Sequence, residues 1–268
     1  MHVLLLRSPR LCACRVQVKR DGGKQWVQLL HGVNGCATPG TLTALMGASG
    51  AGKSTLMDVI CGRKTSGERG GEILVNGFVT DHRAFARVMG YVEQTDLLAT
   101  FATVRETLEF SAALRLSKDV TPPRRATFVN DVLKLLELDH VADQLVGDET
   151  TATSISPGQR KRLNIGVELV ANPTVLFLDE PTSGLDSRSA LSVMRVIKRV
   201  ALTGRTVVAT IHQPSAEIFK KFDNVLLLQV RCGWVWLVVR SMLGAVEWED
   251  RKSVVRVPVF SRAMWGCC

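Results

Sequence analysis

The sequence predicts an α/β fold with a mainly parallel sheet, and three observations lead to that prediction. Short apolar runs of the β type alternate with longer segments of helical periodicity along most of the chain. Several of these runs are almost wholly apolar, as expected for central strands that are covered on both faces. A glycine-rich loop joins the first run to a helical segment, which is the order found in parallel α/β sheets.

The expected strands and helices follow one another along the chain. The expected strands are Thr41–Met46, Ile73–Val75, Val175–Leu178 and Thr206–Ile211. The expected helices are one that starts at Lys53, then Val104–Leu116, Arg124–Leu138, Gln159–Ala171 and Arg188–Ala201. Residues 97–164 are mostly helical, with a break at Pro122-Pro123, which predicts a helical insertion between two halves of the sheet.

Composition limits the class of protein but does not choose a function. The 268 residues are 46% hydrophobic, enough for one domain with a subdomain or for two small domains. The net charge of +9 fits a basic surface, an anionic ligand, a membrane face or nucleic acid. Seven scattered cysteines without paired Cys-x-x-Cys elements predict reduced thiols rather than a metal site. No apolar run reaches the ~18–20 residues that a membrane span needs, so none is expected within this chain.

A phosphate-binding loop is the most specific local signal. Residues 47–54 read Gly-Ala-Ser-Gly-Ala-Gly-Lys-Ser and match the pattern G-x-x-x-x-G-K-[ST] between an expected strand and an expected helix. Lys53 is expected to reach the β- and γ-phosphates of ATP, and Ser54 to place its hydroxyl on Mg²⁺. A glycine-rich turn that matches by chance is the alternative, which the strand–loop–helix context opposes. The expected nucleotide-binding residues here are Gly47, Ala48, Ser49, Gly50, Ala51, Gly52, Lys53, Ser54 and Thr55.

Two acids follow the expected strand Val175–Leu178. Unpaired acids are costly to bury, so we expect Asp179 and Glu180 to emerge at the carboxyl end of the strand, where open α/β sheets bind ligands. Asp179 suits a hold on Mg²⁺, and Glu180 is placed to orient or deprotonate the attacking water. An acidic helix cap is the alternative.

Further motifs complete an ordered set that resembles the ATP-binding cassette (ABC) ATPase family over residues 24–229. They read Ser-Ile-Ser-Pro-Gly-Gln at 154–159, Pro-Thr-Ser-Gly-Leu-Asp at 181–186 and Ile-His-Gln-Pro-Ser at 211–215. Their wording is similar to the G subfamily, including its pleiotropic drug resistance type. The resemblance implies a P-loop NTPase (RecA-like) core with an antiparallel β portion near the N-terminus and an inserted helical subdomain.

The resemblance also implies domain boundaries. Residues 21–229 would form the ABC ATPase domain, with the core at about 21–96 and 165–229 and the helical subdomain at about 97–164. Residues 1–20 are left as an unassigned N-terminal tail and 230–268 as an atypical C-terminal tail. We expect these ends to reflect a truncation or an aberrant gene model, and a separate subunit with its own tails is the alternative.

The resemblance assigns roles to residues outside the phosphate loop. Gln94 matches the glutamine loop that contacts Mg²⁺, and His212 matches the switch histidine near the γ-phosphate. Asp186 matches the loop that couples two sites. Ser156, Gly158 and Gln159 match the signature segment, which completes the ATP site of a facing domain. Physical chemistry agrees in part, because Ser156-x-x-Gln159 predicts a helix N-cap with a capping box.

Three residues need separate comment. Pro157 stands where the family usually has glycine, so one amide donor to phosphate is lost, although proline is tolerated at the first position of a helix. Ile155 replaces the usual leucine, a mild change. Trp26 is the candidate for stacking on adenine, with a core tryptophan as the alternative.

The expected function is ATP hydrolysis that powers an ABC-type exporter of drug or lipid-like substrates at the cytoplasmic face of a membrane. The expected partners are a second ABC ATPase domain in a head-to-tail dimer and a transmembrane domain in the same protein or another chain. No nucleic acid is expected as a partner, because the chain lacks a basic stripe with interleaved aromatics. A soluble ABC ATPase outside transport and a non-catalytic transporter fragment are the alternatives.

Overall fold

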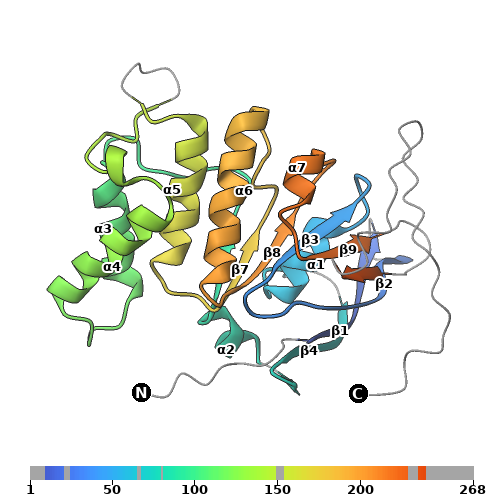
Figure 1. Cartoon of the computed structure of the whole chain (residues 1–268). Helices are drawn as coiled ribbons and strands as arrows, with labels where there is room; N and C mark the ends of the chain where they lie inside the picture. The colour runs from blue at the N-terminus through green and yellow to red at the C-terminus, as the bar shows by residue number, and fades with distance from the viewer. Residues whose placement is uncertain are drawn as a thin grey trace.

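The computed structural model describes residues 10–20, 25–64, 68–79, 81–148, 154–228 and 235–239. A six-stranded sheet lies at the centre of the molecule, with helices packed against it (Figure 1). The helices of the inserted region gather at one end of this sheet, and a four-stranded sheet lies at the other end.

The central sheet is almost entirely parallel, which confirms the predicted fold class. Its order is β10-β9-β3-β8-β7-β6, and every neighbouring pair from β9 to β6 runs parallel. The edge strand β10 pairs antiparallel with β9. The strands are β3 (Leu42–Gly47), β6 (Met89–Val92), β7 (Val175–Leu178), β8 (Thr206–Thr210), β9 (Asn224–Leu228) and β10 (Val235–Val239).

Both faces of the central strands are buried, and this explains why their sequences are apolar runs rather than alternating patterns. In β7, Leu176 and Leu178 belong to a core shared with helix α6 (Ser187–Leu202), whereas Phe177 belongs to a second core shared with α1 (Lys53–Ile60). Successive side chains of a strand point to opposite faces, so one short run stabilises two layers at once.

The second sheet is antiparallel and has the order β2-β1-β4-β5, as expected for the N-terminal part of the chain. Its strands are β1 (Arg10–Arg20), β2 (Gln25–Cys36), β4 (Glu68–Val75) and β5 (Phe78–Val79). The structure therefore differs from the expectation of a tail over 1–20, because residues 10–20 form the strand between β2 and β4. Irregular pairing between Leu11 and Gln17 breaks the period-2 pattern by which a strand is recognised.

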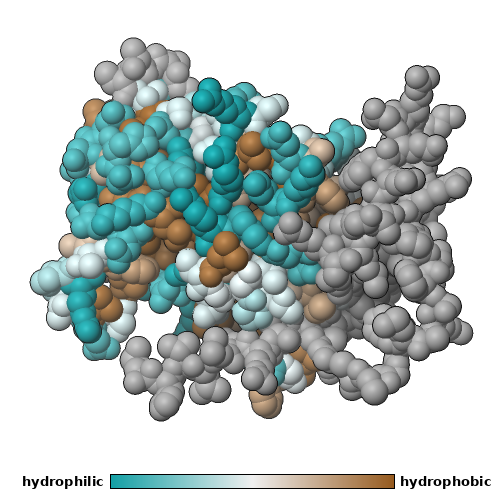
Figure 2. Space-filling view, in the orientation of Figure 1, coloured by the Kyte–Doolittle hydropathy of each residue, from teal (hydrophilic) through white to brown (hydrophobic). Residues whose placement is uncertain are grey.

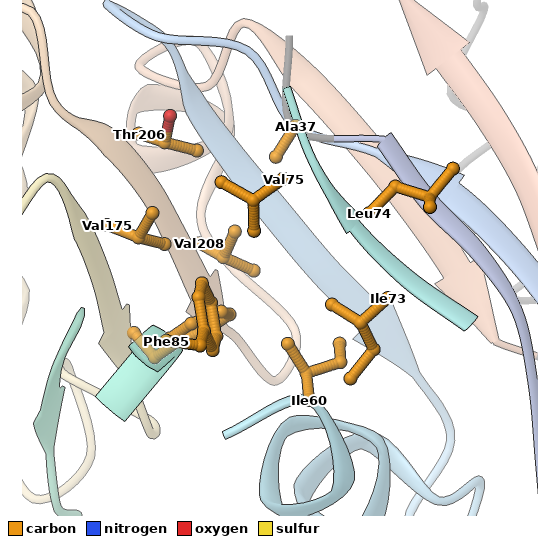
Figure 3. A pocket seen from close by; sticks show the side chains of 10 residues that line it. Ala37, Ile60, Ile73, Leu74, Val75, Phe85, Val175, Thr206 and Val208 are labelled. Carbon is orange, nitrogen blue, oxygen red and sulfur yellow. The ribbon is translucent and has the colours of Figure 1, made fainter. Parts of the chain in front are cut away.

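A small cavity of about 20 Å³ lies in the second core. Val75 of β4, Phe85 of α2 (His82–Ala86) and Val208 of β8 reach it from three elements (Figure 3). Phe85 also meets Phe177 edge to face, with ring centroids 6.4 Å apart.

The inserted region consists of α3 (Val104–Arg115), α4 (Pro122–Leu135), a 3₁₀ turn η2 (Asp139–Val141) and α5 (Pro157–Leu169). The expected break at Pro122-Pro123 is instead the first turn of α4. Proline is tolerated there because the first amides of a helix have no intrahelical partner. The helix also ends earlier than expected, since Glu137 adopts a left-handed backbone with φ 55°.

The last helix, α7, covers Ala216–Phe219. None of the helices in the described ranges is both long enough and apolar enough to cross a membrane. Apart from β10, residues 229–268, which include the expected C-terminal tail, lie outside the described residues.

Candidate functional site

Four candidate loops leave the same edge of the central sheet. The phosphate loop follows β3, Gln94 follows β6, Asp179 and Glu180 follow β7, and His212 follows β8. The strands β3, β8, β7 and β6 are consecutive neighbours and all parallel. Their carboxyl ends therefore meet at one edge, which is where open α/β sheets bind ligands.

The phosphate loop has the backbone that its glycines permit. Gly50 and Gly52 adopt φ values of 75° and 92°, which residues other than glycine rarely adopt. Lys53 begins α1, is buried, and its Nζ donates to the carbonyl oxygens of Gly47 at 2.9 Å and Ala48 at 3.1 Å. The ammonium group thus lies inside the loop. Together with the loop amides and the N-terminus of α1, it would favour the binding of a negatively charged phosphate group.

Part of the loop lies at the molecular surface, whereas Ala51 is buried. Ala48, Ser49 and Gly50 are exposed, and Ser54 on the first turn of α1 is exposed as well. Gly47 also has a packing role, because a Cβ atom there would lie 2.5 Å from the carbonyl oxygen of Leu228. Glycine at this point lets β3 pass closely beside β9 before the loop begins.

Asp179 is fixed through both of its carboxylate oxygens. The Thr210 hydroxyl donates to Oδ1 at 2.6 Å, and the Tyr91 hydroxyl donates to Oδ2 at 3.2 Å. Burial, and then the charge of Asp179, raise the pKa of Tyr91, so its hydroxyl stays protonated and remains a donor. The carboxylate is therefore oriented by two neutral hydroxyl groups.

Gln94 and Glu180 are brought together by the two loops that carry them. Gln94 Nε2 donates to Glu180 Oε2 at 3.0 Å and lies 3.4 Å from the hydroxyl of Ser183. Glu180 has a left-handed backbone with φ 43°, an uncommon conformation for a residue with a side chain. Both side chains and Asp179 thus lie at the same end of β7.

A buried lysine of α5 connects the glutamine loop to the helical region. Lys161 Nζ donates to the carbonyl oxygen of Gln94 at 2.8 Å and to Asp96 Oδ1 at 2.7 Å. Asn164, one turn further along α5, donates to the same Asp96 oxygen at 2.8 Å. The backbone of the glutamine loop is therefore tied to the helix that begins at the signature segment.

The signature segment forms the helix start that its sequence predicts. The Ser156 hydroxyl accepts from the Gln159 amide, the Gln159 side chain accepts from the Ser156 amide, and Pro157 is the first residue of α5. Gly158 packs against Ser189 of α6 so closely that a Cβ atom would lie 3.2 Å from the Ser189 Cβ. In Figure 1, α5 lies toward the left end of the central sheet and α1 toward its right end. The structure therefore does not bring this segment to its own phosphate loop.

His212 and Asp186 occupy exposed positions near the same edge. His212 lies two residues after the end of β8, and its neighbour Gln213 has φ 43°. Asp186 caps α6 by accepting from the amides of Arg188 and Ser189. Hydrogen bonds from the side chain and the amide of Ser189 lower the pKa of Asp186, which keeps it ionised.

Three residues at or beside the site were missed from sequence. Tyr91 and Thr210 precede the recognised Gln94 and His212 by a few positions, and their hydroxyls could have been noticed at the ends of strands that flank Asp179. Lys161 gave no such signal, because it lies in a run of three basic residues that reads as a solvated face. The described part of Trp26 is its backbone in β2, so its stacking role lies outside what the structure describes.

The donor atoms at this edge suit a magnesium ion. A hydroxyl from Ser54, an amide oxygen from Gln94 and a carboxylate from Asp179 are all oxygen donors, which Mg²⁺ prefers over nitrogen or sulfur. Mg²⁺ also keeps several waters and binds phosphate oxygens in such sites, so few protein ligands are needed. The residues present therefore fit a nucleotide with its metal ion.

Comparisons with known proteins agree with this geometry. The sequence matches the protein family described as ABC transporter over residues 30–183. It is 54% identical over 203 residues to ABC transporter G family member 36 of Arabidopsis thaliana, covering 76% of this chain and 14% of that protein. It is also 54% identical to ABC transporter G family member 38 of Oryza sativa subsp. japonica, covering 76% of this chain and 13% of that protein.

Solved structures share the fold at lower sequence identity. An ADP-bound ATP-binding cassette of an ABC transporter superposes with a TM-score of 0.65 at 21% identity, covering 82% of this chain and 89% of that chain. A dimeric bacterial ABC transporter cassette gives a TM-score of 0.60 at 24% identity, covering 81% and 94%.

The fold, the loop set and the family match thus define a nucleotide-binding cassette of the P-loop class. The chain belongs to the ABC transporter family, and its relatives are members of the G subfamily. It spans about one seventh of the length of the relatives it matches.

Proposed function

We propose that this chain binds and hydrolyses ATP, and that it does so as the motor of an ABC-type membrane exporter. The observation that supports this most is the hydrogen bond of 3.0 Å between Gln94 and Glu180. It lies beside Asp179, whose carboxylate accepts hydrogen bonds from two hydroxyl groups. An acid at this point, next to the loop that carries Lys53, is placed to act on a water in line with a bound γ-phosphate.

Each residue of the edge takes one role in this proposal. The loop amides of residues 47–55 and Lys53 bind the phosphates, and Glu180 accepts a proton from the attacking water. His212 contacts the γ-phosphate region from β8. Ser54, Gln94 and Asp179 would hold Mg²⁺, which supplies neutralisation of the charge on the transferred phosphoryl group when it is bound.

A second copy of the cassette would complete the site. The segment of Ser156, Gly158 and Gln159 starts α5 far from its own phosphate loop, and Ser156 is exposed, so we propose that this segment contacts the nucleotide of a facing domain. A solved relative in fold is described as a dimeric cassette. We therefore propose a head-to-tail dimer in which two ATP molecules lie between the phosphate loop of one copy and the signature segment of the other.

The helical region offers a surface for a membrane domain. Four apolar residues at the glutamine loop and on α3 are highly exposed: Leu97 is 81%, Phe101 95%, Phe110 68% and Leu114 70% accessible. Phe110 and Leu114 are four residues apart and share one face of α3. We propose that this surface meets a transmembrane domain at the cytoplasmic face of a membrane, as part of an exporter of drug or lipid-like substrates.

Mixing two inactive variants tests both hydrolysis and the head-to-tail arrangement. Lys53→Ala damages the phosphate-loop half of a site, and Ser156→Arg damages the signature half. A mixed dimer concentrates both lesions in one site and leaves the other intact. Random pairing makes half the dimers mixed, and each mixed dimer has one intact site out of two. The mixture should therefore regain about one quarter of wild-type hydrolysis.

A same-half mixture provides the matched control for this experiment. Lys53→Ala mixed with Glu180→Gln leaves no intact site, so hydrolysis should stay at the level of the separate variants. Recovery in this control, or no recovery in the first mixture while the wild-type chain is active, would contradict the head-to-tail site. A wild-type chain that binds ATP without hydrolysing it would contradict the proposed activity.

A further inference from the structure

Thr210 is a buried threonine that joins the two acids of the site. It ends β8 and has 0% of its surface exposed. Its hydroxyl oxygen accepts the backbone N–H of Glu180 at 2.7 Å and lies 2.6 Å from Asp179 Oδ1. An amide N–H can only donate, so the proton of the hydroxyl is left to point at the carboxylate. The Thr210 hydroxyl thus contacts both acids: its oxygen accepts from the Glu180 amide, and its hydrogen is donated to the Asp179 carboxylate.

The second oxygen of Asp179 is held from the opposite side. Tyr91 lies on β6 and Thr210 on β8, and these strands flank β7, which carries Asp179. The Tyr91 hydroxyl donates to Oδ2 at 3.2 Å, and its ring is covered by the guanidinium of Arg63, 4.2 Å from the ring centroid. The carboxylate is therefore held in one plane by donors on both neighbouring strands.

The same threonine stabilises an uncommon backbone. Glu180 has φ 43°, a strained conformation for a residue with a side chain. Its N–H is directed at Thr210, and its carboxylate meets Gln94 at 3.0 Å. Without the hydroxyl, the amide of Glu180 would lose its partner and the direction of the side chain would be less restricted.

We propose that Thr210 is a positioning residue for the metal-dependent step, and that Tyr91 assists it on the other oxygen of Asp179. This inference rests on the proposed ATP-binding function. The two hydroxyls are neutral, so they orient Asp179 without reducing the charge that attracts a divalent cation. Mg²⁺ demands nearly ideal octahedral geometry, and groups that orient a ligand typically change metal affinity or activity by about 10–100-fold when removed.

The test measures the metal-dependent part of nucleotide affinity in the full chain. The dissociation constant of fluorescent mant-ATP is measured in EDTA and in MgCl₂. The constant in EDTA divided by the constant in MgCl₂ gives the ratio that is compared among variants. Thr210→Val keeps the shape of the side chain but removes the hydroxyl, and we expect the ratio to fall about tenfold while affinity in EDTA stays unchanged. Thr210→Ser restores a hydroxyl and should keep the ratio within about twofold of wild type.

Matched variants separate this role from a structural one. Thr206 begins the same strand and is 3% exposed, so Thr206→Val repeats the chemical change away from the acids and should leave the ratio unchanged. Tyr91→Phe should lower the ratio less than Thr210→Val, since its hydrogen bond is longer. Where hydrolysis is measured, the loss in Thr210→Val should appear in kcat rather than in KM for ATP.

Two results would overturn the inference. One is a wild-type ratio in both Thr210→Val and Tyr91→Phe, and the other is an equal loss of affinity with and without Mg²⁺ that Thr210→Ser does not rescue. These results differ from failure of the proposed function, in which the wild-type chain binds mant-ATP but does not hydrolyse ATP. Even in a chain that binds but does not hydrolyse ATP, the affinity ratio still measures whether Thr210 contributes to metal-dependent binding.

Discussion

Replacing Lys161 by methionine probes the link between the glutamine loop and α5. The lysine side chain is 4% exposed and donates two charged hydrogen bonds, to the Gln94 carbonyl and to Asp96. Breaking a buried ion pair typically costs 3–5 kcal/mol. Asp96 is 15% exposed and keeps Asn164 as a donor, so we expect the lower end, about 3 kcal/mol. For a domain of this size that is a fall of roughly 6–12 °C in Tm.

Thermal unfolding of the full chain, followed by circular dichroism, measures this change. Lys134→Met on the exposed side of α4 is the matched control and should stay close to wild type. The double variant Lys161→Met/Asp96→Asn should lose about 2 kcal/mol less than the sum of the single variants, because the pair interacts directly. A Tm for Lys161→Met within about 1 °C of wild type would refute this account of the buried pair.

Three smaller predictions concern stability and reactivity. Thr103→Ala removes the capping box of α3 and should cost about 1 kcal/mol in unfolding experiments, whereas Thr103→Ser should cost little; equal stability of both variants would argue against the cap. Val208→Ile adds one methylene at the cavity in Figure 3 and should raise stability by about 0.8 kcal/mol, while a lower Tm would mean that the space is too small. Burial raises the pKa of the Cys61 thiol, so peptide mapping should find it unmodified by iodoacetamide at pH 8 in the folded chain and modified after unfolding; rapid labelling of the native chain would contradict its burial.

Local patterns were sufficient where neighbours in sequence supply the interactions. The capping box of Ser156 and Gln159 forms as predicted, because both partners lie within one helical turn. The phosphate loop lies between β3 and α1 as predicted, because its glycines and its flanking apolar segments act locally. The parallel sheet was predictable for the same reason, since strands buried on both faces are apolar throughout.

Interactions between distant segments could not be predicted in this way. Arg160, Lys161 and Arg162 are three consecutive basic residues, and basic residues usually lie among the hydrophilic residues of a surface, which Figure 2 shows in teal. All three are at most 9% exposed. Arg160 donates to carbonyl oxygens of residues 146 and 147, Lys161 to the glutamine loop, and Arg162 to carbonyl oxygens of residues 136 and 137. Only tertiary packing brings such carbonyls and acids to the helix, so no sequence window contains the signal.

The same limit applies to the hydroxyls around Asp179. Tyr91, Asp179 and Thr210 are far apart in sequence, and their contact depends on the strand order β8-β7-β6. The sequence predicted β7 and β8 but not β6, which carries Tyr91, and it did not predict the order of the strands. Once the order is known, the side chains at the ends of flanking strands become obvious neighbours of the acids.

Comparing ATP binding with ATP hydrolysis in Glu180→Gln tests the central claim most directly. The substitution keeps the shape of the side chain, and its amide can still meet Gln94, but it cannot accept a proton from water. With Glu217→Gln on the exposed start of α7 as control, we expect Glu180→Gln to bind ATP within about threefold of wild type and to lose at least about 100-fold in kcat. Wild-type turnover in Glu180→Gln would contradict the role of Glu180 and with it the proposed catalytic site.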